Sequence, residues 1–123
     1  MKPFRVRFLL PAIIVILAAQ QSLWAHAFAD HSEPRVGATV SKPPADVRIW
    51  FTQEVEPAFS RIEVVGPDGK EVDKKDTHVD PSDHHVLIVS LPALPPGTYK
   101  VHWHVVSVDT HHTQNDFKFV VKP

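Results

Sequence analysis

The 123-residue chain contains no cysteine, and this absence excludes two features at once. Without a thiol no disulfide can form, so a domain of this size must be held together by packing alone. A blue-copper centre is excluded as well, because its metal requires a thiolate ligand.

Long hydrophobic runs are also scarce, and the longest lies near the N-terminus. Three basic residues precede an apolar run over residues 8–19. A helix needs about 20 apolar residues to cross a bilayer, so this shorter run indicates a secretory signal peptide. We expect residues 1–25 to be removed and residues 26–123 to form the exported domain, without membrane insertion after processing.

The point of cleavage has two interpretations. Cleavage after Ala25 puts Leu23 where a small residue is preferred, but makes His26 the first residue of the mature chain. Cleavage after Ala27 satisfies the A-x-A pattern and removes His26 altogether. The choice matters for metal binding, because an N-terminal histidine offers its α-amino group together with its imidazole Nδ1. Such a chelating nitrogen pair suits Cu(II).

A positive surface charge is missing from the expected mature chain. Residues 26–123 carry 10 basic and 14 acidic side chains, a formal charge of −4 with histidine neutral. Nucleic acids and anionic membranes attract basic surfaces, so this balance argues against both as partners.

Apolar and polar residues alternate in several short segments that are separated by proline and glycine. Period-two alternation of this kind predicts half-buried β-strands. We expect such strands over residues 47–52, 61–65 and 99–106, a continuously apolar strand over residues 86–91, and a last inward stripe of Phe117, Phe119 and Val121. The polar residues 66–85 are expected to form a loop-rich hairpin region. The chain has 12 prolines, and together with the period-two stripes they interrupt every candidate helix of the mature region. The sequence therefore predicts an all-β, antiparallel sandwich.

Nine histidines are an unusual number for a chain of this length. His78, His84 and His85 lie in the polar segment, where solvated loop positions explain them. His102 and His104 are two residues apart on the outward face of the strand expected over 99–106. That spacing can chelate a metal, but an exposed polar face explains it equally well, so the role of the pair stays open.

Asp109 and His111 follow the same strand and open the loop before the last one. This position belongs to one end of the expected sandwich. Taken alone, an Asp-x-His sequence also fits an aspartate that caps a turn beside an exposed histidine.

Over essentially the whole mature region the sequence resembles the CopC-like periplasmic copper-binding (copper resistance) proteins. The resemblance rests on the opening His26-Ala27, on Trp50-Phe51-Thr52, and above all on residues 97–111 with Phe117 and Phe119-Val120-Val121 beyond. It implies a Greek-key β-sandwich of cupredoxin-like or immunoglobulin-like type. It also favours cleavage after Ala25, which keeps the histidine in first place.

The resemblance implies a periplasmic Cu(II)-binding protein, not an enzyme, that sequesters or delivers copper in copper homeostasis and resistance. The implied ligands of one Cu(II) per chain are the α-amino group and imidazole of His26, the carboxylate of Asp109 and the imidazole of His111. Three nitrogens and one oxygen form the tetragonal set that Cu(II) prefers. A membrane copper transporter of the CopD type is the implied partner.

Three positions need separate comment. The family often carries a methionine-rich Cu(I) site, but the only methionine here is Met1, so we expect no thioether site. An acidic residue that approaches copper in some members is replaced by Gln53, next to Glu54, which leaves the role of this position open. His112 competes with His111 for the metal, although neighbouring side chains of an extended segment point in opposite directions.

Two other functions fit parts of the sequence. A histidine-brace copper oxidase also combines an N-terminal histidine with a second one. The Asp109 carboxylate would crowd its copper, however, and the 98 residues of 26–123 leave little room for a polymer-binding face. An interaction sandwich with incidental histidines would follow from cleavage after Ala27.

Overall fold

The computed structural model describes residues 2–4 and 27–123. The expected signal peptide and His26 therefore lie outside the described residues, apart from residues 2–4. Within the described ranges, no helix has the length and apolar character needed to span a membrane.

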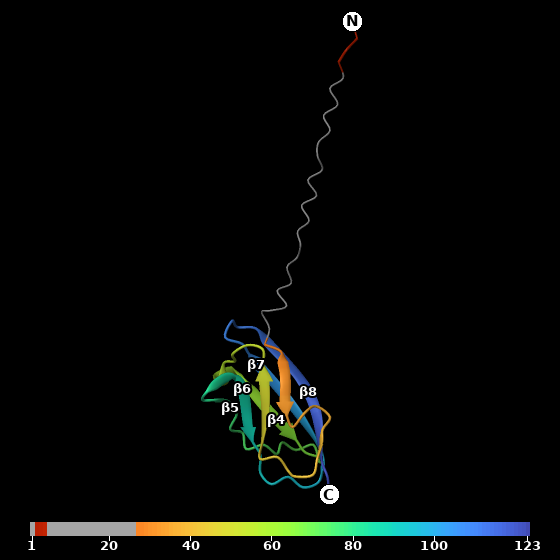
Figure 1. Cartoon of the computed structure of the whole chain (residues 1–123), viewed down its shortest axis with the longest axis vertical. Helices are drawn as coiled ribbons and strands as arrows, with labels where there is room; N and C mark the ends of the chain where they lie inside the picture. The colour runs from red at the N-terminus through yellow and green to blue at the C-terminus, as the bar shows by residue number, and fades with distance from the viewer. Residues whose placement is uncertain (1, 5–26) are drawn as a thin grey trace.

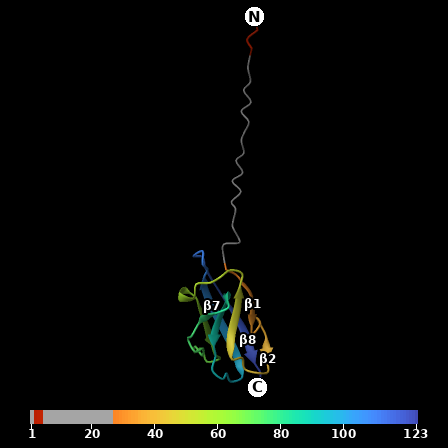
Figure 2. The same ribbon diagram turned by 60° about the vertical axis from the view of Figure 1, so that its left-hand side comes forward.

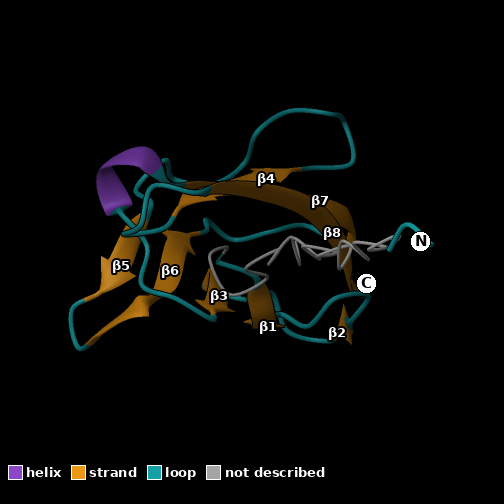
Figure 3. Ribbon diagram, turned by 90° about the horizontal axis from the view of Figure 1, so that it is seen from above, coloured by secondary structure: helices purple, strands orange, loops and turns teal. Residues whose placement is uncertain are grey.

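Residues 27–123 form strands joined by turns and loops (Figure 1), with one turn of 3₁₀ helix, η1, which is drawn purple in Figure 3. In chain order the elements are β1 (Ala29–Glu33), β2 (Thr39–Val40), β3 (Asp46–Phe51), η1 (Pro57–Phe59), β4 (Arg61–Val65), β5 (His78–Asp80), β6 (Asp83–Ser90), β7 (Gly97–Val106) and β8 (His112–Val121).

The strands build two four-stranded sheets, ordered β1-β3-β6-β5 and β2-β8-β7-β4. Figure 3 looks along the sandwich and shows the two sheets as facing layers. The chain passes repeatedly from one sheet to the other, so the β-sandwich predicted from the sequence is confirmed. Its strand pairs are antiparallel, except that β2 runs parallel to β8 over two residue pairs.

The core lies between the sheets and is filled by the inward stripes expected from the alternation. On β7 the buried side chains are Tyr99, Val101, Trp103 and Val105. Aromatic rings join the layers: Trp103 meets Phe51 of the other sheet edge-to-face, with ring centres 5.1 Å apart. Fully burying a large apolar side chain contributes about 1.5–3 kcal/mol, so such packing can stabilise the fold without a disulfide.

The polar region over residues 66–85 is more ordered than the sequence suggested. The expectation that His78, His84 and His85 lie in loops was wrong, since His78 belongs to β5 and the other two to the start of β6. The β5–β6 hairpin accounts for this. The Asp80 carboxylate accepts hydrogen bonds from the backbone N–H of Ser82 (2.9 Å) and from its hydroxyl (2.8 Å), which closes the turn.

One end of the sandwich gathers three chain segments that are distant in sequence. β7 ends there, β8 begins there, and β1 starts beside them with Ala29 opposite Phe51 of β3. In Figure 2 the loop between β7 and β8 and the start of the described domain lie at the same end. This is the end that carries Asp109 and His111.

Candidate metal site

A tight turn over residues 107–111 brings the two predicted ligands together. The backbone N–H of Ser107 donates to the carbonyl of His111 (3.0 Å), and the N–H of Thr110 donates to the carbonyl of Ser107 (2.8 Å). Thr110 adopts φ 71°, a left-handed conformation that is uncommon for a non-glycine residue. The reversal of the chain places the Asp109 and His111 side chains next to each other.

The Asp109 carboxylate is held from two sides. Its Oδ2 lies 3.2 Å from Nδ1 of His111, and its Oδ1 accepts a hydrogen bond from the Ser107 hydroxyl. The Ser107 hydrogen bond, followed by the contacts with His111, lowers the pKa of the Asp109 carboxyl. Oδ2 of Asp109 therefore contacts Nδ1 of the His111 ring, and the other ring nitrogen, Nε2, takes no part in this contact.

The start of the domain is anchored beside this turn. The Thr113 hydroxyl of β8 donates to the carbonyl of Ala27 (2.7 Å), and Ala27 is fully buried. The backbone N–H of Phe28 donates to the Thr52 hydroxyl (3.1 Å), while the N–H of Thr52 donates back to the Phe28 carbonyl (2.9 Å). Ala27, the residue that follows His26, is therefore held by Thr113, which lies two positions after His111 in the chain.

The turn after β3 packs against the same loop. Gln53 and Glu54 lie in this turn, and the carbonyl of Glu54 accepts a hydrogen bond from the N–H of Val108 (3.1 Å). Gln53 therefore borders the segment that carries Asp109.

The structure separates His111 from its competitor. His112 is the first residue of β8, pairs with Val106, and lines a hollow on the outer face of the sheet with His104. His102 and His104 also lie on that outer face, away from the Asp109–His111 pair. Among the residues that the structure describes, no three His, Asp or Glu side chains are grouped closely enough to hold a metal. A metal site that includes Asp109 and His111 would therefore need donors from elsewhere.

Sequence reasoning did not single out the residues that surround the Asp109–His111 pair. Ser107 orients Asp109, and Thr113 and Thr52 hold the start of the domain. Thr52 and Ser107 stood within the segments that carried the family resemblance, but nothing local marked their roles.

The profile of the CopC domain matches residues 29–122. The chain belongs to the CopC domain family. This CopC-domain chain is 38% identical to Protein YobA of Escherichia coli (strain K12) over 112 residues, 90% of each chain. It is also 32% identical to copper resistance protein C of Xanthomonas campestris pv. juglandis over 127 residues, covering 97% of this chain and 99% of that relative.

A solved CopC-domain structure has the same architecture. The crystal structure of CopC from Methylosinus trichosporium OB3b superposes with a TM-score of 0.75 at 30% identity, and the match covers 80% of this chain and 95% of that one. The family and the cupredoxin-like sandwich inferred from sequence motifs are both confirmed. The ligand set of His26, Asp109 and His111 stays a prediction.

Proposed function

We propose that this protein binds one Cu(II) ion at the end of the sandwich where Asp109 and His111 meet. Membership of the CopC domain family and the relative named copper resistance protein C support a role in copper homeostasis. The observation that carries the assignment of the site is the anchoring of Ala27 by Thr113, next to the turn that presents His111.

The proposed ligands are the α-amino group and imidazole of His26, the imidazole of His111 and the carboxylate of Asp109. Consecutive Cα atoms are about 3.8 Å apart, so a residue joined to the anchored Ala27 is within reach of the 107–111 turn. The two donors of the turn and the two of an N-terminal histidine make a three-nitrogen, one-oxygen set. Among the divalent first-row metals, Cu(II) is the one that such a ligand set binds most tightly.

Asp109 has two ways of serving the metal. While its Oδ2 contacts Nδ1 of His111 it orients that ring, as carboxylates behind metal-bound histidines commonly do. To bind copper directly, Oδ2 must exchange this contact for the metal. In both arrangements the negative charge of Asp109 offsets the charge of the cupric ion.

The proposal includes processing and location. Residues 1–25 act as a signal peptide, cleavage after Ala25 exposes the amine of His26, and the mature protein sequesters or delivers copper in the periplasm without catalysing a reaction. A membrane copper transporter of the CopD type is the proposed recipient. The charge pattern of the leader and the family resemblance support these steps.

The function is tested by titrating the exported protein with Cu(II). Mass spectrometry should show a chain that starts at His26 and, under native conditions, carries one copper ion, with a matching cupric signal in electron paramagnetic resonance. A chain that starts at Phe28, or no cupric signal at one equivalent, would overturn the proposal.

Acidification should weaken this binding progressively. Protons compete with the metal for an α-amino group of pKa about 8 and for imidazoles of pKa about 6.5, so the affinity should fall as the pH drops through these values. The lowered pKa of Asp109 keeps its carboxylate ionised over the same range, so it adds no titration there. Affinity measured between pH 8.5 and 5.5 checks this, and a flat profile would exclude the amine as a ligand.

Thr113→Val should lower copper affinity about tenfold, within the range found for residues that orient metal ligands. The substitution keeps the shape of the side chain but removes the hydroxyl that donates to the Ala27 carbonyl. Thr98→Val, an exposed position at the start of β7, is the matched control and should leave affinity unchanged. Competition titration against a chelator measures both, and equal affinities would show that the anchoring of Ala27 does not position the site.

A further inference from the structure

The outer face of the β2-β8-β7-β4 sheet carries a second set of nitrogen donors. On β7 the side chains of His102 and His104 point away from the core, because Val101, Trp103 and Val105 between and beside them are buried. Both histidines are half-buried, their ring centres are 6.5 Å apart, and the ring planes are tilted by 46°. A metal bonded to a ring nitrogen lies about 3 Å from the ring centre, so two rings that share one ion have centres at most about 6 Å apart, which is close to the separation of His102 and His104.

His102 is held in the way that metal-binding histidines usually are. Asp116, directly opposite on β8, contacts Nδ1 of His102, and this hydrogen bond is the main cause of the lowered pKa of the Asp116 carboxyl. Nζ of Lys100 lies 3.3 Å from the other carboxylate oxygen and fixes it further. A carboxylate on one ring nitrogen leaves Nε2 as the donor and increases its basicity.

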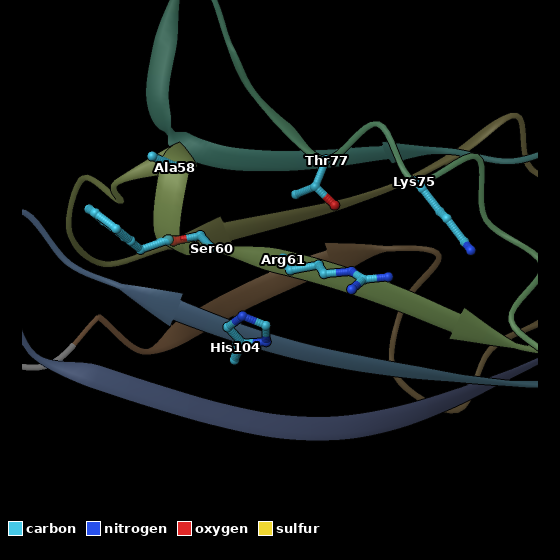
Figure 4. A pocket seen from close by; sticks show the side chains of 7 residues that line it. Ala58, Ser60, Arg61, Lys75, Thr77 and His104 are labelled. Carbon is cyan, nitrogen blue, oxygen red and sulfur yellow. The ribbon is translucent and has the colours of Figure 1, made fainter.

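His104 opens onto space that an ion with its water ligands can occupy. It borders a hollow of about 330 Å³ that is also lined by His112, Thr113 and Gln114. On its other side it borders the hollow drawn in Figure 4, where it rises from β7 beside Arg61 of β4. The positive charge of Arg61 is offset there, because its guanidinium lies 2.6 Å from Glu71 and 3.4 Å from Glu63.

We propose that His102 and His104 chelate a second divalent transition-metal ion on this face, with Asp116 as the positioning residue behind His102. Only two protein side chains coordinate the ion, and water completes its shell. The site is therefore weaker than the one at the sandwich end and exchanges metal readily. By the order of divalent affinities, Cu(II) binds best among the first-row metals.

The test follows backbone amide signals of the ¹⁵N-labelled mature protein during addition of Cu(II) alone, since a paramagnetic ion broadens the signals near it. The second equivalent should broaden residues 101–105 of β7 and 114–117 of β8. His102→Ala and His104→Ala should each remove this effect, and Asp116→Asn should weaken the second binding step about 10- to 100-fold. His84→Ala, an exposed histidine of β6, is the matched control and should change nothing.

The same titration of His111→Ala separates this proposal from the main site. Broadening around β7 should persist in that variant, whether or not copper binds at the sandwich end. Broadening centred on the β5–β6 hairpin, or a second step that survives His102→Ala unchanged, would overturn the proposal.

Discussion

Adding one glycine ahead of His26 in the mature protein should lower its affinity for Cu(II) by about 100-fold, or roughly 3 kcal/mol. The extension converts the α-amino group into an amide and so destroys the chelate between the amine and Nδ1 of the same residue. The fold should be unaffected, because the described contacts of this region begin at Ala27, which Thr113 anchors. Competition titration against a chelator of known affinity measures the change.

A glycine added after Pro123 serves as the control for the extension. It changes chain length by the same amount but lies at the other terminus, and affinity should stay the same. If the N-terminal glycine were equally harmless, the free amine would not be a ligand and the proposed site would have to be abandoned.

His111→Ala should lower copper affinity by a similar factor of about 100, whereas His112→Ala should change it less than about threefold. The two histidines are neighbours in sequence, but His111 contacts Asp109 and His112 borders the outer hollow with His104. The two variants therefore compare two neighbouring imidazoles that point to different sides of the chain.

Titration gives the affinities of the two variants, and the nitrogen hyperfine pattern in electron paramagnetic resonance should lose one coordinated nitrogen only in His111→Ala. Thermal unfolding of the metal-free variants should stay close to that of the parent protein, since both positions lie at the surface end of the β7–β8 hairpin. A larger loss of affinity in His112→Ala would mean that the turn rearranges to present the other ring.

Much of the fold could be predicted because two central strands, β3 and β7, alternate buried residues with more exposed ones. Every second residue of β3 is buried, and so is every second residue of β7 from Tyr99 to Val105, so the period-two pattern is visible in the sequence. β1 could not be predicted in this way, because Ser32 is the only buried residue among its five. β2 is only two residues long and is defined by its parallel partner β8, which no local pattern can reveal.

Of the candidate metal site, the sequence predicted the proposed ligands but not the contacts that position them. Asp109 and His111 were predicted as ligands from the motif resemblance, and the turn that joins them is local in sequence. The hydrogen bond from Thr113 to Ala27 spans 86 positions, so its partner is determined by the folded sandwich and not by neighbouring residues. His26 lies outside the described residues, and its role stays a prediction.

The contact between Thr113 and Ala27 ties together segments from opposite ends of the domain. A copper ion bound across that contact would act as a removable cross-link, because an unfolded chain would have to close a long loop to keep the same ligands. Metal binding should then raise the melting temperature as copper concentration increases, since the ion favours the native state alone. In a chain without cysteine, the bound copper would thus stabilise the fold as a disulfide does, but reversibly.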